Sequence, residues 1–285
     1  MKLLKRLTRS LIKRLPGGKA FLHRRTLYKS YLFKPGSKEV YLGLHGENKT
    51  ADAIFLPAFD RIFLLLSAFY QNGLRRDILE FGVMLGYSAK ILTECTKRFQ
   101  LSSTRIHLFD SFEGLPEASE EDQKSYECIN GHWKKGILST PTGLEVYLEH
   151  ELRKKIGEKR VFAVKGFFEQ TLEEHIRKKK IQKALLVNLD CDLYSSSKYV
   201  LRTLMEYDLL QDGTILICDD WMTSFGNPNL GQRKAVQEIL EENPRWAFEP
   251  YFNYGLGSQV FVVHDLSVSR GKQLKVYENS SSHSH

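Results

Sequence analysis

Short apolar runs alternate with stretches of helical periodicity from residue 77 onward, and this alternation constrains the fold more than any other feature of the sequence. Runs suited to buried parallel strands cover residues 77–81, 105–109, 161–165, 184–189 and 214–218. Helical patterns cover residues 88–99, 144–154, 172–179, 196–210 and 231–242. Two closing strands, at 247–252 and 259–264, predict an antiparallel pair at one edge. The sequence therefore predicts an α/β fold with a doubly wound, mostly parallel, seven-stranded, Rossmann-like sheet and helices on both faces.

The chain has 285 residues, of which 42% are hydrophobic, and is long enough to bury the core of one ordinary domain. The pattern predicts three parts: a basic N-terminal extension and cap of helix and loop (1–50), the α/β domain (51–266) and a polar, disordered tail (267–285). Early in the domain, "LPAFDRIFLLLSAFYQNG" predicts a helix with Pro57 near its start and Gly73 past its end.

The net charge of +8 is concentrated at the N-terminus. Residues 1–34 hold eleven Lys and Arg and no acid, so the other 251 residues hold 31 bases against 34 acids. Within "KLLKRLTRSLIKRL" the apolar residues recur at helical spacing, with the cations opposite. This segment could lie on an anionic membrane surface, hold a polyanion, or dock its leucines on the rest of the protein, and the sequence leaves these alternatives open.

Cysteine usage and targeting signals bear on the compartment. The four cysteines form no CxxC pair, and two of them fall in strand-like runs, which predicts reduced thiols. No stretch reaches the roughly 18 apolar residues of a membrane span, and the N-terminus shows no cleavable signal. We expect a cytoplasmic protein. If residues 1–34 lie on an anionic membrane surface, they would make a peripheral contact with the inner membrane face.

Carboxylates follow two of the predicted strands where each strand ends. "LVNLDCDL" contains Asp190 and Asp192, and "TILICDDW" ends in Asp219 and Asp220. Adjacent strands lie about 4.8 Å apart, so Asp190, Asp219 and Asp220 can converge at the carboxyl edge. Such carboxylates repel one another unless a cation lies among them, and a partial shell of oxygen ligands suits Mg²⁺, which we favour. The alternative is capping of helix and loop amides; for Asp192 we expect capping, or support of the metal site from outside.

The ends of the first three strands carry candidate nucleoside-binding residues. They are Glu80 near the end of the first strand with Gly82, Gly86 and Ser88 after it, Asp110 and Ser111 after the second, and Gly166 and Phe167 after the third. The glycines allow a sharp turn close to a ligand, although a tight strand-to-helix turn alone explains them and the G-x-G-x-x-G fingerprint is absent. Asp110 could bind a ribose diol or cap a helix, and Phe167 could meet an adenine ring or pack in the core; these alternatives stay open.

Six segments together resemble, in order, the macrocin O-methyltransferase family (TylF type). They are "LEFGVMLGYS", "LFDSFEGLP", "KGFFEQTL", "LDCDLYSS", "ICDDW" and "FGNPNLGQRKAVQEIL". The resemblance covers roughly residues 50–264, and its most specific pieces are F-D-S-F-E-G-L-P, D-x-D-L-Y-x-S and G-Q-R-K-A-V. It implies a class I methyltransferase fold and an enzyme that uses S-adenosylmethionine and Mg²⁺.

The resemblance also implies roles for individual residues. Cofactor contacts would come from Glu80, Gly82, Gly86 and Ser88 to the methionine and sugar, and from Asp110 to the ribose hydroxyls. We expect Ser111, Gly166 and Phe167, from their places at the strand ends, to complete the cofactor site. Asp190, Asp219 and Asp220 would bind Mg²⁺. The family uses a histidine base ahead of the third strand, for which "INGHWKKG" offers His132; His45 and Glu47, in an earlier loop, are the alternatives.

The implied reaction is methyl transfer to a hydroxyl of a sugar, a glycosylated natural product or a glycan. A metal that binds two neighbouring hydroxyls lowers the pKa of one and aligns it with the sulfonium methyl, so that only proton removal is left to a base. Asp190 and His132 are therefore the expected catalytic residues. We expect a small-molecule or glycan acceptor and no nucleic acid as partner, and the sequence leaves self-association open.

Two other functions stay as alternatives. Asp190 and Asp192 could form the D-x-D of a metal-dependent glycosyltransferase, although the turn from Glu80 to Ser88 followed by Asp110 suits a nucleoside without phosphate. The second alternative is a non-catalytic binding protein tethered by residues 1–34. It predicts that deletion of this segment abolishes function while Asp219→Asn leaves it intact.

Overall fold

A computed structural model describes residues 49–69, 76–255 and 257–267 of the chain. The amphipathic segment 1–34, the residues His45 and Glu47, and nearly all of the tail lie outside the described residues. The predicted division into an extension, a domain and a tail therefore stays a prediction.

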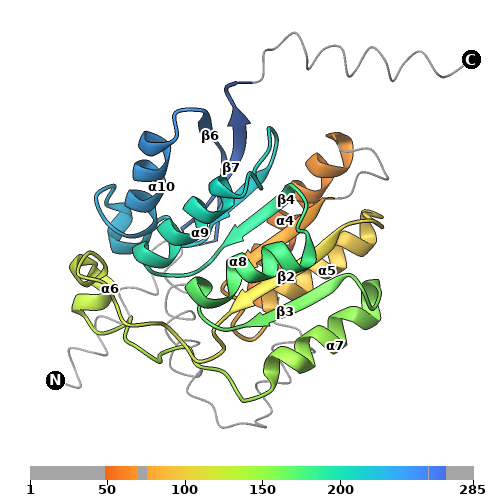
Figure 1. The fold of residues 1–285 in the computed structure, drawn as a ribbon, viewed down its shortest axis with the longest axis horizontal. Coiled ribbons are helices and arrows are strands. Elements are labelled where there is room, and N and C mark those ends of the chain that lie inside the picture. The colour runs from red at the N-terminus through yellow and green to blue at the C-terminus, as the bar shows by residue number, and fades with distance from the viewer. Residues whose placement is uncertain (1–48, 70–75, 256, 268–285) are drawn as a thin grey trace, which may run out of the picture.

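One seven-stranded sheet forms the middle layer of the molecule (Figure 1). Its strands are β1 (Asp77–Phe81), β2 (Arg105–Asp110), β3 (Val161–Lys165), β4 (Ala184–Leu189), β5 (Ile215–Cys218), β6 (Trp246–Tyr254) and β7 (Ser258–Asp265). The strand order is β3-β2-β1-β4-β5-β7-β6; the first five strands in the chain run parallel, and β7 is antiparallel to both its neighbours. The predicted sheet with an antiparallel pair at one edge is confirmed.

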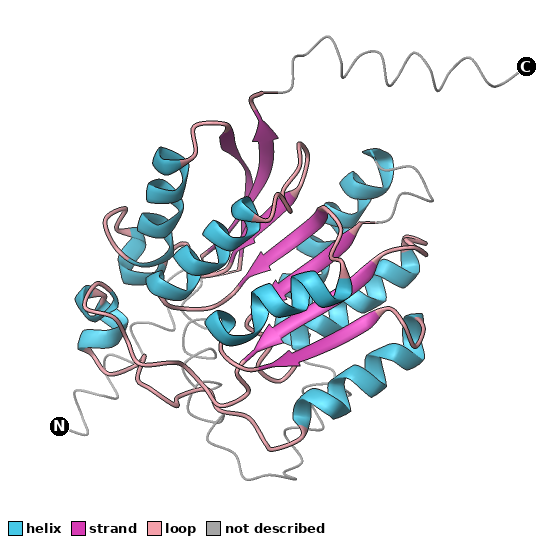
Figure 2. Cartoon of the chain, viewed as in Figure 1, coloured by secondary structure: helices cyan, strands magenta, loops and turns pink. Residues whose placement is uncertain are grey.

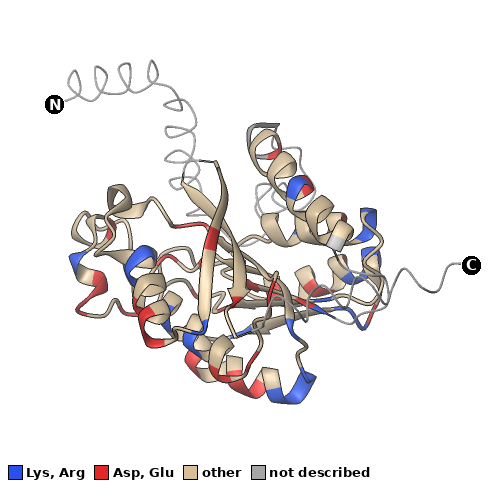
Figure 3. Ribbon diagram, turned by 90° about the horizontal axis from the view of Figure 1, so that it is seen from above, with Lys and Arg blue, Asp and Glu red and all other residues tan. Residues whose placement is uncertain are grey.

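Helices cover both faces of this sheet (Figure 2). The helices on one face are α4 (Lys49–Phe69), α5 (Tyr87–Arg98) and α7 (Leu144–Ile156), and those on the other are α8 (Phe168–Lys179), α9 (Tyr194–Glu206) and α10 (Gly231–Glu242). Three short helices are η1 (Asp122–Lys124), α6 (Tyr126–Ile129) and η2 (Thr223–Gly226). Lys, Arg, Asp and Glu lie mainly on the helices and loops around the sheet (Figure 3).

Each face of the sheet has its own hydrophobic core. Ile78 packs with residues of α4, α5 and α7, whereas Leu79 and Phe81 pack with residues of α8, α9 and α10. The central strands β1, β2, β4 and β5 are buried along almost their whole length, because helices cover both of their faces. This burial explains why they read as continuous apolar runs.

The helix predicted around Pro57 is longer than expected. It begins at Lys49, so Pro57 lies inside α4 and not near its start, and Gly73 lies outside the described residues. Proline removes one backbone hydrogen bond of a helix, and burial of Phe59, Ile62 and Phe63 against the sheet outweighs that loss. Among the helices that the structure describes, none combines the length and the apolar composition that crossing a membrane requires.

Candidate active site

The candidate site lies at the carboxyl edge where the strand order reverses, between β1 and β4. Two main-chain hydrogen bonds tie the strand ends together: Gly82 N donates to Phe109 O and Asp190 N donates to Phe81 O, both over 2.9 Å. Gly82 has a φ of 88°, and a Cβ at this position would lie 1.6 Å from Asp190 O. Only glycine fits here, because a side chain would force the ends of β1 and β4 apart.

The carboxylate of Asp110, at the end of β2, holds the loop between β1 and α5. Its Oδ2 accepts hydrogen bonds from the amides of Val83 (2.7 Å) and Met84 (2.8 Å), and its Oδ1 accepts one from the amide of Phe112 (2.6 Å). The loop ends at Gly86, which has a left-handed φ of 80°. A carboxylate has about four acceptor sites, so one is left for a ligand hydroxyl. Asp110 can therefore cap these amides and bind a ribose hydroxyl at the same time. Its binding of a ribose stays a prediction.

Glu80 is fully buried in β1, near Ser88 at the start of α5. Asn188 Nδ2 donates to Glu80 Oε1 over 3.1 Å, while Glu80 Oε2 has no hydrogen-bond partner. Burial raises the pKa of Glu80 to about 7, and Ser88 and Asn188 limit this rise by favouring the ionised form. A buried carboxylate oxygen without a partner is the kind of atom that a ligand hydroxyl or amine satisfies. The environment of Glu80 therefore fits the predicted cofactor contact.

The remaining predicted cofactor residues follow β2 and β3. Ser111 closes a turn, because its hydroxyl donates to Gly114 O over 2.7 Å. The amide of Gly166 donates to Asp110 O over 3.0 Å, which holds the ends of β2 and β3 together. Phe167 is half-buried and is the N-cap residue of α8. These contacts bring the three residues to the same edge as Glu80, and their roles toward a cofactor stay predictions.

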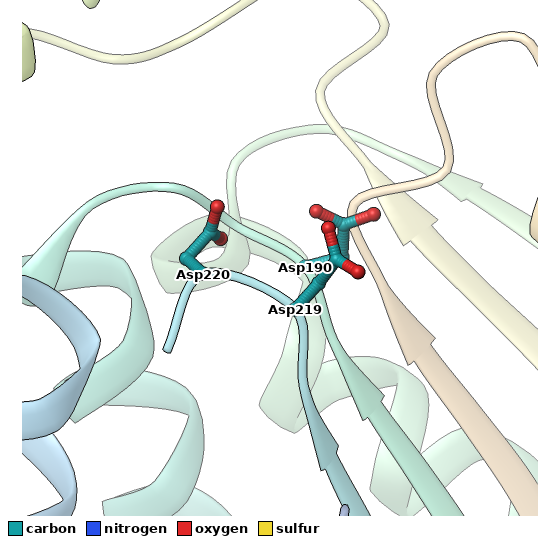
Figure 4. A group of neighbouring side chains, drawn as sticks. All are labelled: Asp190, Asp219 and Asp220. Carbon is teal, nitrogen blue, oxygen red and sulfur yellow. The ribbon is translucent and has the colours of Figure 1, made fainter. Parts of the chain in front are cut away.

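Asp190, Asp219 and Asp220 come together at the ends of β4 and β5, as predicted (Figure 4). Each offers one carboxylate oxygen, and these three oxygens lie within 4.8 Å of one another. Asp219 and Asp220 are buried, and Asp190 is partly exposed. In Figure 4 the carboxylates of Asp190 and Asp219 lie close together, with that of Asp220 to one side.

Other groups orient two of these carboxylates. Ser258 Oγ, from the start of β7, donates to Asp219 Oδ1 over 2.5 Å, and the amide of Asp192 donates to Asp220 Oδ2 over 2.8 Å. Asp192 has a left-handed φ of 62°, a conformation that is uncommon outside glycine. Asp192 was expected either to cap a helix or to support the cluster from outside. Its main-chain amide supports the cluster.

The first turn of α9 has a partner that the sequence did not predict. The amide and the hydroxyl of Ser195 donate to Asp122, over 3.2 Å and 2.6 Å, so an aspartate of η1 provides the contact expected from Asp192. The N-cap residue itself is Leu193, whose side chain makes no capping hydrogen bond. Asp122 is buried and links the segment between β2 and α7 to the edge that carries Asp190.

His132 lies on that same segment, just after α6. It is exposed, and its ring centroid lies 6.5 Å from that of Tyr126. Glu127 of α6 accepts hydrogen bonds from the amide (2.9 Å) and the hydroxyl (2.7 Å) of Ser224, which docks α6 on η2 after β5. Within the described residues the metal-type cluster consists of the three aspartates without His132. Its role as a base stays a prediction.

Sequence reasoning missed three residues that hold the site. Asn188 contacts Glu80, Ser258 contacts Asp219, and Gln232 of α10 contacts Asp220. Asn188 could have been noticed as a polar residue inside an apolar strand, and Gln232 belongs to the segment G-Q-R-K-A-V. Ser258 offered no signal, because a serine beside a glycine reads as part of a turn.

Solved structures share this architecture. The calicheamicin methyltransferase CalS11 superposes with a TM-score of 0.62 at 19% identity, covering 87% of this chain and 93% of that one. The O-methyltransferase NovP superposes with a TM-score of 0.56 at 19% identity, covering 73% and 78%. The fold is therefore that of the class I, Rossmann-like methyltransferases.

Residues 59–242 match the family model of macrocin O-methyltransferases (TylF), and the chain belongs to this family. One relative is a tetracenomycin rhamnosyl 4'-O-methyltransferase of Streptomyces olivaceus, 24% identical over 66% of this chain and 69% of the relative. Another is the mycinamicin III 3''-O-methyltransferase of Micromonospora griseorubida, 23% identical over 53% and 57%. The chain is thus an O-methyltransferase of this family. This membership disagrees with both alternatives, the glycosyltransferase and the non-catalytic binding protein.

Proposed function

We propose that this enzyme transfers the methyl group of S-adenosylmethionine to a hydroxyl of a sugar, with Mg²⁺ bound by Asp190, Asp219 and Asp220. The observation that carries the proposal is the convergence of three carboxylates at the edge of the sheet where the candidate cofactor residues also lie. Relatives that methylate the sugars of a tetracenomycin and of mycinamicin III support a glycosylated natural product as acceptor.

The donor set suits a hard divalent cation. Three carboxylate oxygens provide part of the octahedral shell of Mg²⁺ and leave positions for water and acceptor oxygens. Hydrogen bonds from Ser258 and from the amide of Asp192 hold two of the carboxylates in place, although they do not neutralise the charge of the cluster. Hard oxygen ligands gathered at a partly exposed point therefore favour Mg²⁺ over a softer metal.

When bound, Mg²⁺ would lower the pKa of an acceptor hydroxyl, and S-adenosylmethionine would supply an activated methyl carbon. Glu80 and Asp110 would hold the cofactor. Glu80 Oε2 has no hydrogen-bond partner among the described residues, and the carboxylate of Asp110 keeps one acceptor site beyond its three hydrogen bonds. Asp190, the least buried aspartate of the cluster, would orient the acceptor. His132, exposed beside α6, is the proposed base.

An exposed apolar surface next to the cluster is proposed to bind the part of the acceptor beyond the reacting sugar. The amide and the hydroxyl of Thr223 donate to Asp220 O over 3.1 Å and 2.7 Å, so η2 begins at the cluster itself. Phe225 of η2 is 80% exposed and packs edge-on against Tyr126 of α6, with 4.9 Å between the ring centroids. Rings held out in solvent in this way suit an apolar group that follows the sugar.

The substitution Asp219→Asn tests the proposed metal-dependent reaction. It keeps the size of the side chain and removes one charged ligand, so we expect methyl transfer to fall about a hundredfold or more, which corresponds to about 3 kcal/mol. The assay follows tritium from labelled S-adenosylmethionine into a rhamnosyl glycoside, and Mn²⁺ binding is measured by electron paramagnetic resonance.

The matched control is Asp208→Asn, which removes an exposed aspartate that pairs with Lys183 away from the cluster. It should leave both measurements unchanged. Full activity of Asp219→Asn, or activity of the wild type after exhaustive removal of divalent ions, would refute the role of the metal. Absence of transfer to any glycoside by the wild type would refute the proposed acceptor class.

A further inference from the structure

Gln232 joins the two strand ends that carry the aspartate cluster. It is the second residue of α10 and its side chain is fully buried. Its Nε2 donates to Leu189 O over 3.0 Å, and its Oε1 accepts from the amide of Asp220 over 3.0 Å. Leu189 immediately precedes Asp190, so one side chain contacts the main chain at the end of β4 and at the end of β5.

The two contacts replace hydrogen bonds that the sheet no longer provides. The pairing of β4 with β5 ends at Leu189 and Cys218, and one further bond runs from the Asp219 amide to Leu189 O over 3.1 Å. Asp220 lies beyond the last ladder bond, where its buried amide would lack a strand partner. Gln232 provides that partner and adds a second donor to Leu189 O.

The two contacts require a primary amide at the end of the side chain at position 232. Only a side chain with a donor and an acceptor at one end can bridge a carbonyl and an N–H group in this way. A glutamate would lose the donor and bring a fourth carboxylate to the cluster, and an apolar residue would leave both main-chain groups without this partner. Glutamine meets both requirements without adding charge.

We infer that Gln232 is a positioning residue that holds Asp190 and Asp220 at the separation required for binding a divalent cation. This inference rests on the proposed metal-dependent function. Without the bridge, the ends of β4 and β5 can move relative to each other, and a cation then has to draw the carboxylates together at a cost in affinity. The expected consequence is weaker metal binding with the cofactor site intact.

The cofactor site should be unaffected because other contacts hold it. Glu80 is held by Asn188, and Asp110 by the amides of Val83 and Met84, and none of these contacts involves α10. The helix also has anchors of its own. Arg233 Nη1 donates to Gly226 O over 2.6 Å, and Ala235, Val236 and Ile239 are buried.

The test compares Gln232→Met, Gln232→Asn and Gln237→Met with the wild type. Methionine keeps the length and loses both hydrogen bonds, whereas asparagine keeps the amide and is too short to reach both partners. Gln237 lies on the same helix, is exposed, and donates through its amide to Glu241 over 2.9 Å, away from the aspartate cluster, so its substitution is the matched control. Mn²⁺ affinity is measured by electron paramagnetic resonance, and S-adenosylhomocysteine affinity by calorimetry.

We expect the Mn²⁺ dissociation constant to rise about tenfold to a hundredfold in both Gln232 variants and to stay unchanged in Gln237→Met. S-adenosylhomocysteine should bind all variants as it binds the wild type, which also reports that they are folded. In turnover, raised Mg²⁺ should restore kcat of Gln232→Met, because the cation site is weakened and not removed. If one of the two Gln232 variants fails to fold, the Mn²⁺ affinity of the other variant tests the inference.

Two results would overturn the inference, and they are distinguishable. If the wild type binds Mn²⁺ and a folded Gln232 variant binds it equally well, the positioning role is wrong and the proposed function stands. If the wild type binds neither Mn²⁺ nor Mg²⁺, the proposed metal-dependent function is wrong as well.

Discussion

At the scale of single residues, Glu80 differs most from an ordinary surface carboxylate. It is fully buried, one of its oxygens has no partner, and burial raises its pKa from 4.5 to about 7. Between these two values the folded protein holds a proton that the unfolded chain has released. The contribution of Glu80 to stability is therefore complete below about pH 4.5 and is lost as the pH rises through about 7.

The substitution Glu80→Gln removes this titration and keeps an oxygen that can accept from Asn188. A pKa difference of one unit corresponds to about 1.4 kcal/mol. Between about pH 4.5 and about pH 8 we expect the unfolding free energy of the wild type to fall by about 3 kcal/mol more than that of the variant. Urea titration of the cofactor-free protein at both pH values measures this difference. Glu158→Gln, at an exposed position, should behave like the wild type; equal pH dependence of all three proteins would contradict the prediction.

At the scale of elements, the ends of β1, β4 and β5 form one hydrogen-bonded unit. The amide of Asp190 donates to Phe81 O at the end of β1, and that of Asp219 donates to Leu189 O at the end of β4. The amide of Gly82 ties the same edge to β2 by donating to Phe109 O, one residue before the end of that strand. This arrangement places the loop between β1 and α5 and the aspartate cluster at a single edge of the sheet. The close approach of Gly82 to Asp190 O is the contact that permits it.

The substitution Gly82→Ala should break that contact. The added Cβ would meet Asp190 O at 1.6 Å, and the left-handed φ of 88° is itself unfavourable for alanine. We expect a loss of about 3 kcal/mol or more in the unfolding free energy, measured by urea denaturation. Gly136→Ala separates the clash from the unfavourable φ. Gly136 has a φ of 75°, but within the described part of the chain, its two chain neighbours aside, nothing lies within 4 Å of the point that its Cβ would occupy. It should cost only about 1–2 kcal/mol, and equal losses for the two variants would refute the role of the clash.

At the scale of the whole molecule, the segment between β2 and α7 docks on three separate elements. Asp122 contacts Ser195 of α9, Glu127 contacts Ser224 of η2, and Glu121 pairs with Lys234 of α10 over 2.8 Å. These contacts hold α6 against η2, so the exposed rings of Tyr126 and Phe225 stand beside the loop that carries Asp220. A contact of residues 1–34 with a membrane stays one of the alternatives that the sequence leaves open, and so does self-association.

The substitution Phe225→Ala tests whether this docked surface binds the acceptor. We expect KM for a rhamnosyl glycoside with an apolar aglycone to rise about tenfold, because a stacking aromatic ring is lost, while KM for S-adenosylmethionine stays the same. The measurement is initial-rate kinetics with tritium-labelled cofactor. Tyr147→Ala removes an exposed tyrosine of α7 and serves as the control. An unchanged acceptor KM in Phe225→Ala would rule out the proposed contact.

Much of the fold and part of the site follow from local patterns. The bounds of the central strands were predicted to within one residue, because a strand that is buried on both faces consists of a continuous run of apolar residues. The start of α4 was wrong because packing overrode the local preference of Pro57 for the first turn. The convergence of Asp190 with Asp219 and Asp220 was predictable, because parallel strands in one sheet end at a common edge.

The sequence by itself determined the alternation of strands and helices, the acids at the strand ends and the glycine at the tightest turn, because periodicity and residue type act over a few neighbouring positions. Only the tertiary structure decided which group holds each carboxylate. Asn188 reaches Glu80 across 108 positions of the chain, and Gln232 reaches Leu189 across 43. Such bonds depend on distances of a few tenths of an ångström between remote elements, and only the packing of the two cores against the sheet sets those distances.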